Sequence, residues 1–252
     1  MTFEVSAEVY RRFMGRFSEP LADELVRLLD PRPGTTALDV GCGPGALTSR
    51  LVRVLGEEAV SAVDPQQSFV DAVHDQWPGV HAALSGAESL PFEDGTFDTT
   101  AAELVVHFMS DPVAGIREMR RVTRPGGVVA ACVWDLAGAH SPLSDFWAAA
   151  RSLDPDVTTE AGLPGAREGH LAELFEQAGL TDLETAVLTI SVRFETFQEW
   201  WQPFTFGVGP AGAHVAAQDD AGREALRDAC ARRFGPPPFD VVGKAWTVVA
   251  PA

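Results

Sequence analysis

Residues 37–45 read Ala-Leu-Asp-Val-Gly-Cys-Gly-Pro-Gly, and this stretch decides the fold. An apolar strand runs into glycines at alternating positions, Gly41, Gly43 and Gly45, and a helical pattern follows over residues 46–55. Only glycine lets the backbone turn sharply and also lie against a ligand without a Cβ in the way. A strand, a glycine-rich turn and a helix N-terminus together predict a nucleotide-type binding edge.

The spacing of these glycines separates the loop from other nucleotide loops. The dinucleotide fingerprint is G-x-G-x-x-G, whereas the pattern here is G-x-G-x-G with Pro44 between the last two glycines. No Gly-Lys-Ser/Thr follows, which excludes a Walker loop. A glycine-rich loop alone is a weak indication, so the rest of the chain has to support it.

Asp64 ends a second short apolar stretch, residues 59–64, about twenty residues beyond the loop, where nucleotide folds carry a ribose-binding acid. A carboxylate there can accept hydrogen bonds from both ribose hydroxyls. The alternative is that Asp64 caps the helix that starts near Pro65. The glycine loop upstream favours the ribose role, with Pro65 beside it.

Two further motifs make the interpretation specific. Residues 87–92 read Ala-Glu-Ser-Leu-Pro-Phe, and residues 124–127 read Arg-Pro-Gly-Gly. With these motifs, residues 35–135 resemble the class I S-adenosylmethionine-dependent methyltransferases, specifically the small-molecule group with the Leu-Pro-Phe motif. The resemblance implies S-adenosyl-L-methionine as the cofactor. Its methionine part would lie on the glycine loop, its ribose on Asp64 and its adenine beside Ala87 and Glu88.

One position departs from the family pattern. Many relatives carry an acidic residue directly before the Ala-Glu pair, where this chain has Gly86. The adenine amino group would then bind a backbone carbonyl, Glu88 or water.

Strands that alternate with helices predict an α/β fold with a doubly wound, mainly parallel sheet. The resemblance implies seven strands in a Rossmann-like arrangement, with the last two antiparallel at the edge. We expect an N-terminal helical lid over residues 1–34, with a break and restart of the helix at residues 18–20. The cofactor-binding core would comprise residues 35–195 and 240–252, and residues 196–239 would form a helical, aromatic insertion that contributes to a substrate cap.

Two more residues are candidate cofactor ligands by position. Asp39 lies two residues before Gly41 and, by the resemblance, contacts the amino end of the methionine through the loop or water. Its alternative role is to cap backbone N–H groups of the loop. Arg16 lies in a helix that relatives fold over the cofactor, so it can pair with the cofactor carboxylate. An exposed surface arginine is the alternative.

Candidate catalytic residues follow the fourth strand. His107 is placed where relatives hold the acceptor, and a neutral imidazole there can act as a general base. Its alternative is a structural histidine bonded to a loop carbonyl. Glu103, at the strand edge, can hold a cationic amine acceptor, or can be a solvated or cap-paired carboxylate.

The expected acceptor pocket is aromatic. Tryptophan and phenylalanine residues of the insertion would roof an apolar acceptor, with one tryptophan below and the single tyrosine on the methionine side. Their alternative is a small satellite core, and for the histidine of this set it is an ordinary surface position. The candidate pocket residues are Tyr10, Trp134, His140, Trp200, Trp201 and Phe204.

Composition limits the possible partners. The chain has 252 residues, of which 46% are hydrophobic and 22% charged, which is typical of a soluble globular protein. The net charge of −17, with 36 acidic against 19 basic residues, makes nucleic acid an improbable partner. No apolar run is long enough to span a bilayer, and the first five residues do not begin a signal peptide.

The three cysteines, Cys42, Cys132 and Cys230, are widely separated and show no metal-ligand spacing, so we expect no metal site. Reduced thiols in a cytoplasmic enzyme fit best.

The favoured function is methyl transfer from S-adenosylmethionine to a small-molecule acceptor at O, N or C. A catalytically silent cofactor-binding module of the same fold is the first alternative. An NAD(P)-dependent oxidoreductase is a second, opposed by the glycine spacing and the Leu-Pro-Phe motif. A methyltransferase of protein substrates also remains open, and the sequence does not determine the oligomeric state.

Overall fold

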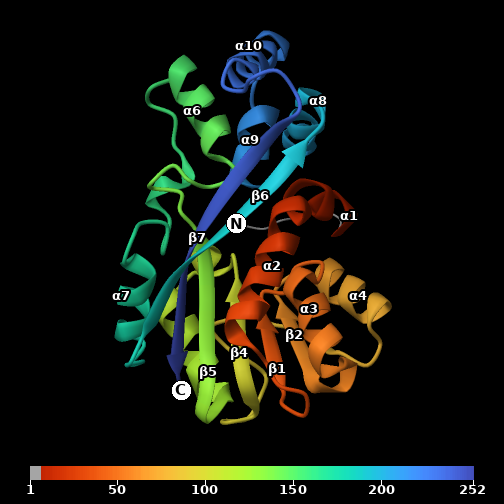
Figure 1. Cartoon of the computed structure of the whole chain (residues 1–252), viewed down its shortest axis with the longest axis vertical. Helices are drawn as coiled ribbons and strands as arrows, with labels where there is room; N and C mark the ends of the chain where they lie inside the picture. Colours follow the sequence, from red (N-terminus) through yellow and green to blue (C-terminus); the bar gives the residue numbers. More distant parts are fainter. Residues whose placement is uncertain (1–6) are drawn as a thin grey trace.

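A single mixed sheet organises the computed structural model, which describes residues 7–252 (Figure 1). Its seven strands lie in the order β3-β2-β1-β4-β5-β7-β6. The five strands β1 to β5 are parallel, whereas β7 pairs antiparallel with both β5 and β6. The predicted doubly wound, mainly parallel, seven-stranded sheet is therefore confirmed. The strands are β1 (Ala37–Val40), β2 (Val60–Asp64), β3 (His81–Leu84), β4 (Phe97–Glu103), β5 (Thr123–Trp134), β6 (Glu184–Phe194) and β7 (Phe239–Pro251).

Helices cover both faces of this sheet, because its central strands are apolar on both sides. All four residues of β1 are buried, as parallel central strands require. One face packs against α2 (Arg16–Leu29) and α3 (Ala46–Leu55), and the other against α5 (Pro112–Val122) and α7 (His170–Gln177). The helix α4 (Gln67–Gln76) joins β2 to β3. This arrangement brings the carboxyl ends of β1, β2 and β4 together at one edge, where open α/β sheets bind ligands.

The N-terminal helix differs from the sequence prediction. It consists of α1 (Ala7–Tyr10), a π-helical turn η1 (Arg11–Gly15) and α2. The expected break at residues 18–20 is wrong, because α2 runs through Ser18 and Pro20. Pro20 removes one backbone donor there, but burial of Phe17 and Leu21 on either side of it holds the helix together. Residues 1–6 of the expected lid, and with them the signal-peptide question, lie outside the described residues.

The helices between β5 and β6 and between β6 and β7 include a group that packs beyond one end of the sheet and is called the cap below. Figure 1 shows the long strands β6 and β7 running out of the sheet toward this cap. Phe204 packs within the cap and against the N-terminal helix: its ring stacks 4.7 Å from that of Phe146 and lies 5.2 Å from that of Phe13 in η1. Residues 196–239, which were expected to be a helical and aromatic insertion, are mostly helical in the structure. The cap elements are α6 (Ser144–Leu153), α8 (Phe197–Trp201), η5 (Gln202–Phe206), α9 (Gly209–Ala216) and α10 (Asp220–Ala231).

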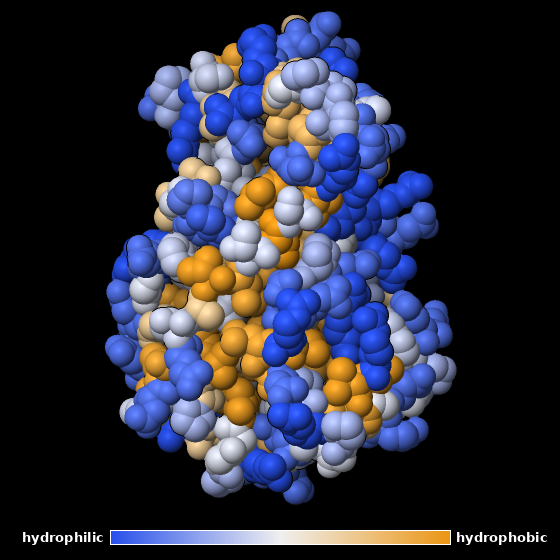
Figure 2. Space-filling view, viewed as in Figure 1, coloured by the Kyte–Doolittle hydropathy of each residue, from blue (hydrophilic) through white to orange (hydrophobic). Residues whose placement is uncertain are grey.

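The surface of the molecule on the side drawn in Figure 1 is partly apolar. Figure 2 shows hydrophobic surface in the middle of the face where β6 and β7 cross it. Within residues 7–252, no helix is both long enough and apolar enough to cross a membrane.

Candidate functional site

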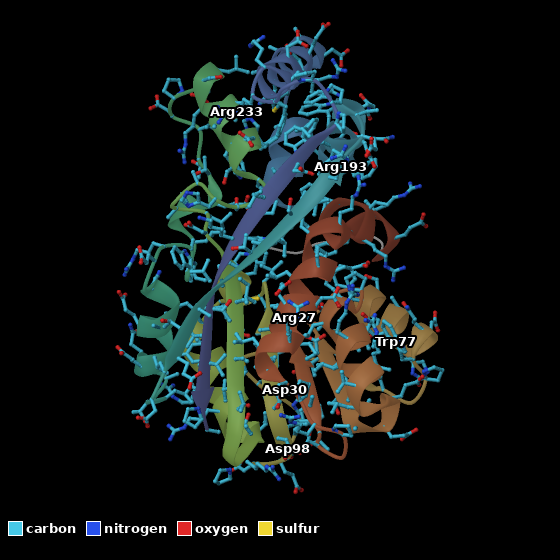
Figure 3. The ribbon with its side chains drawn as sticks, viewed as in Figure 1. Arg27, Asp30, Trp77, Asp98, Arg193 and Arg233 are labelled. Carbon is cyan, nitrogen blue, oxygen red and sulfur yellow. The ribbon has the colours of Figure 1, made fainter. Side chains whose placement is uncertain are left out.

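The glycine loop between β1 and α3 requires glycine at each predicted position. Gly41, Gly43 and Gly45 have φ angles of +73°, +51° and +95°, a region that side chains disfavour. A Cβ on Gly41 would also lie 2.5 Å from Cγ2 of Val105. A Cβ on Gly45 would lie 2.5 Å from the ring of Trp77, which Figure 3 labels. The loop therefore fits tightly between its neighbours and presents backbone, not side chains, to one side.

Asp64, at the end of β2, holds this loop in place. One carboxylate oxygen accepts a hydrogen bond from the Gly43 N–H at 2.9 Å, and the other accepts one from the Gln66 N–H at 2.9 Å. The bond to Gln66 closes the turn before α4 and does not cap the helix, whose first turn has no side-chain cap within the described residues. A carboxylate oxygen accepts more than one hydrogen bond, so the ribose role is compatible with it. Asp64 is buried, and this burial raises its pKa to about 6.

A cleft with both polar and apolar lining residues opens beside the loop and is called the cofactor cleft below. It brings together most of the predicted cofactor residues, namely Gly41, Gly43, Asp64, Pro65, Ala87 and Glu88, together with Glu103 and Tyr10. Other residues of its lining were not singled out from the sequence, among them Gln66, Phe69, Val105, Phe108, Met109 and Ser110.

Two buried carboxylates, Asp39 and Glu103, lie near the glycine loop, and Glu103 also lines the cofactor cleft. Oδ2 of Asp39 accepts a hydrogen bond from the Thr48 hydroxyl at 2.6 Å. Its Oδ1 and both carboxylate oxygens of Glu103 are buried without a hydrogen-bond partner in the part of the chain that the structure describes. Burial raises the pKa of Asp39 to about 7 and that of Glu103 well above its usual range. Unpartnered buried acceptors are costly, so this place suits a ligand that donates hydrogen bonds.

These two carboxylates also border a small cavity against the loop, together with Ser18 of α2. Ser18 was not among the site residues predicted from the sequence, and it reaches this cavity from the helix that follows the π-helical turn at residues 11–15.

A second cavity, the apolar pocket, adjoins the cofactor cleft. Tyr10, Leu104 and Phe108 line both this pocket and the cofactor cleft, so the two share a wall. The predicted residues Tyr10, His107 and Trp134 all contribute to it. Its full lining is Tyr10, Phe13, Met14, Leu104, His107, Phe108, Trp134, Leu136, Leu143, Glu160 and residues 208–211.

His107 is a neutral group in this pocket. The side chain is buried, its Nδ1 has no partner within residues 7–252, and its ring lies 4.0 Å from that of Phe108. Burial lowers its pKa to about 3. In the ligand-free protein, this imidazole accepts hydrogen bonds but has little affinity for a proton at neutral pH.

Several predicted residues are not brought to either cavity. The Arg16 guanidinium donates to Oε1 of Glu199 at 2.6 Å and lies 4.6 Å over the ring of Phe194, between α2 and the cap. His140 lies in a separate surface cleft, where its Nδ1 is 2.6 Å from Asp135. Three more, Trp200, Trp201 and Phe204, are buried among the aromatic rings of the cap, and Gly45 lines a groove on the far side of the loop.

Sequence reasoning missed Glu160, the acidic residue of the apolar pocket. It lies in a loop rich in glycine and proline, where no periodicity marks a buried side chain. Within residues 7–252 there is no group of three or more His, Cys, Asp or Glu side chains that could hold a metal ion.

Comparison with known proteins supports the class of this site. Residues 38–131 match the family model described as methyltransferase domain. Malonyl-[acyl-carrier protein] O-methyltransferase of Serratia marcescens is 30% identical over 165 residues, which cover 66% of this chain and 62% of that protein. The chain spans less than two thirds of the length of this and other curated relatives, from 41% to 62%.

Solved structures show the same fold. The YcgJ protein of Bacillus subtilis superposes with a TM-score of 0.58 at 18% identity, covering 93% of this chain and 97% of that chain. Phosphoethanolamine N-methyltransferase 2 of Haemonchus contortus, in complex with S-adenosylhomocysteine, gives a TM-score of 0.57 at 15% identity, with 92% and 52% covered. Residues 38–131 therefore match a methyltransferase domain, as the motifs predicted, and the chain shares the fold of these solved structures.

Proposed function

We propose that the protein transfers a methyl group from S-adenosylmethionine to a small-molecule acceptor bound in the apolar pocket. One observation carries this proposal: the cofactor cleft and the apolar pocket meet at Tyr10, Leu104 and Phe108. Methyl transfer needs its two reactants side by side in a place without water, and this wall is where they would meet.

The chain's own groups match the parts of the cofactor. Gly41 and Gly43 leave room for a ligand against the backbone, and Asp64 accepts hydrogen bonds at the position of the ribose. The unpartnered oxygens of Asp39 and Glu103 suit the ammonium group of the methionine part. In this proposal Glu103 holds the cofactor and not an amine acceptor.

The adenine end is less polar than in many relatives. Oε1 of Glu88 accepts hydrogen bonds from the N–H groups of Ser110 at 2.8 Å and Asp111 at 3.2 Å, so this carboxylate is already bound to the turn that leads into α5. Because Gly86 carries no side chain, we expect the adenine ring to rest on Ala87 and Met109.

The bound cofactor supplies a methyl group that its sulfonium already activates, so the residues need mainly to orient the acceptor. Tyr10 borders both cavities and the small cavity beside Asp39, which places it at the junction of the two reactants. The Nδ1 atom of His107 can accept a hydrogen bond from an O–H or N–H group of the acceptor. The apolar walls exclude water.

The acceptor need not be that of the relatives. The Serratia marcescens protein is named for a malonyl group, whose free carboxylate is an anion. Within the described residues, no arginine or lysine lines either cavity of this chain. We therefore do not transfer that substrate to it.

The same proposal assigns residues 7–34 as the described part of a lid, residues 35–195 and 240–252 as the core, and residues 196–239 as part of a cap. A cytoplasmic location accords with Cys42, Cys132 and Cys230, which are free and buried. The net charge of −17 and the absence of cations from both cavities in residues 7–252 disfavour nucleic acid as a partner.

Transfer of a labelled methyl group from S-adenosylmethionine to a panel of phenols, amines and carboxylic acids tests the proposal. Label in any organic product supports it. Tight binding of S-adenosylhomocysteine without transfer to any acceptor would instead favour the silent module. Binding of NADH but not S-adenosylhomocysteine would favour the oxidoreductase.

A further inference from the structure

The apolar pocket contains a buried carboxylate, Glu160, which begins the short helix η4 (Glu160–Gly162). The residue is 5% exposed, and burial raises the pKa of its carboxyl group. Burying a carboxylate in an apolar cavity costs free energy, so the position of Glu160 needs a physical reason.

Within residues 7–252, one side-chain donor holds this carboxylate. The indole N–H of Trp147 on α6 donates to Oε2 of Glu160 at 2.7 Å, and Trp147 is itself buried. Thr159 orders the backbone by capping η4 through an N–H bond from Ala161. The side chain therefore has a fixed position, yet its negative charge is not neutralised by any arginine or lysine in the lining of the pocket within residues 7–252.

The other polar side chains of the pocket do not supply a cation. They are Tyr10, whose pKa is raised by burial and by nearby carboxylates including Glu160, the neutral His107, and Trp134, whose indole N–H has no hydrogen-bond partner within residues 7–252. The remaining wall is apolar, with Phe13, Met14 and Leu143 among its members. The polar groups that line this pocket are thus a carboxylate, an imidazole, a phenol and an indole N–H, and none of them carries a positive charge.

We propose that Glu160 selects the acceptor: it binds an N–H or O–H group on an otherwise apolar molecule and rejects anionic acceptors. This inference rests on the proposed function, since it names the substrate class of the same site. An ammonium group would form a charge-assisted hydrogen bond with Glu160, and a hydroxyl would form a weaker one. An anion would face an unneutralised carboxylate where water screens little.

Three probes with one aromatic body and different head groups test the proposal. They are 1-naphthylmethylamine, 1-naphthalenemethanol and 1-naphthoate, each titrated calorimetrically into the protein saturated with S-adenosylhomocysteine. We expect the amine or the alcohol to bind at least about tenfold more tightly than the carboxylate, which corresponds to about 1.4 kcal/mol.

Two variants locate the selection at Glu160. Glu160→Gln keeps an oxygen for the Trp147 N–H and removes the charge, so the amine should lose about tenfold in affinity and the alcohol much less. Glu160→Leu removes the acceptor altogether, so the preference over 1-naphthoate should vanish for both heads. The matched control is Glu168→Gln, at an exposed glutamate of the same loop, which should behave as the wild type.

The pattern of results separates the two head groups. An amine preference lost in Glu160→Gln identifies a cationic amine as the acceptor. An alcohol preference lost only in Glu160→Leu identifies a hydroxyl. The proposal is overturned if 1-naphthoate binds as well as the other probes, if both variants match the wild type, or if no probe binds to the loaded protein.

Affinity for S-adenosylhomocysteine, measured first in every variant, distinguishes failure of this inference from failure of the proposed function. Wild-type protein that does not bind S-adenosylhomocysteine contradicts the proposed function. Normal binding without head-group selection contradicts only the role of Glu160. Unchanged S-adenosylhomocysteine affinity in the Glu160 variants also shows that they are folded.

Discussion

The buried carboxyl group of Asp39, in the small cavity beside the glycine loop, makes the stability of the protein depend on pH. Its carboxylate is 1% exposed, one oxygen accepts the Thr48 hydroxyl, and the other has no partner within residues 7–252. Burial raises its pKa from 3.8 to about 7. A shift of roughly three pKa units corresponds to about 4 kcal/mol in the free energy of unfolding.

The sign of this effect follows from the protonated form. A carboxyl group with a raised pKa in the folded protein stabilises the fold fully below its unfolded pKa, and this contribution is lost as the pH rises toward the folded pKa. For Asp39 the window runs from about pH 4 to about pH 7. Asp64, with a pKa of about 6, acts in the same direction.

The substitution Asp39→Asn tests this reasoning, because asparagine does not titrate. The ligand-free wild type should lose unfolding free energy between pH 4 and pH 7, and the variant should lose about 4 kcal/mol less over that range. Urea unfolding at a series of pH values measures both curves, with the exposed Asp75→Asn as the control. Identical pH dependence in Asp39→Asn and wild type would refute the reasoning.

Three other predictions concern the loop, the lid and the pocket. Gly41→Ala should cost about 2–4 kcal/mol of unfolding free energy and abolish S-adenosylhomocysteine binding, because its Cβ would strike Val105. The control Gly34→Ala has φ +89° and open space around the new Cβ, so it should cost only the backbone strain of about 1–2 kcal/mol. Equal losses of the two variants in urea unfolding would contradict this. Arg16 binds Glu199 and lines neither cavity, so Arg16→Ala should leave S-adenosylhomocysteine affinity within about twofold of wild type by calorimetry. A loss of about tenfold or more would show that Arg16 contacts the cofactor. Burial lowers the pKa of His107 to about 3, so His107 should not titrate near pH 6.5 in the pH profile of the methyl-transfer rate. An inflection near pH 6.5 in the wild type that is absent from His107→Gln would contradict the neutral imidazole.

The local motifs were predictable because each requires a particular residue type at a particular position. Gly41 and Gly43 need positive φ and free space, and Asp64 ends a strand beside them, so these residues together with the family resemblance predicted the place of the cleft. The parallel sheet followed from alternating strand and helix patterns in the same way.

The orientation of the N-terminal helix was not predictable. A π-helical turn at residues 11–15 holds one more residue than an α-helical turn, which rotates the following residues by about 100°. In the structure Ser18 borders the small cavity beside the loop, whereas Arg16 points to Glu199. No residue pattern in the sequence marks that turn.

The acceptor side was only partly predictable. Trp134 and His107 follow strands whose ends meet at the site, so position alone found them. The aromatic composition of residues 196–239 did not distinguish a roof from a satellite core, and Trp200 and Trp201 are buried in the latter. Glu160 lies in an irregular loop, where burial depends on tertiary packing against Trp147.

The most direct measurement of the central claim is calorimetric titration of S-adenosylhomocysteine into the wild type, Asp64→Ala and the control Asp75→Ala. Asp64 bonds the glycine loop and faces the cofactor cleft, whereas Asp75 is exposed on α4. The account predicts one-site binding to the wild type and to Asp75→Ala, and a loss of about tenfold or more in Asp64→Ala. No binding to the wild type, or equal affinity in all three proteins, would contradict it.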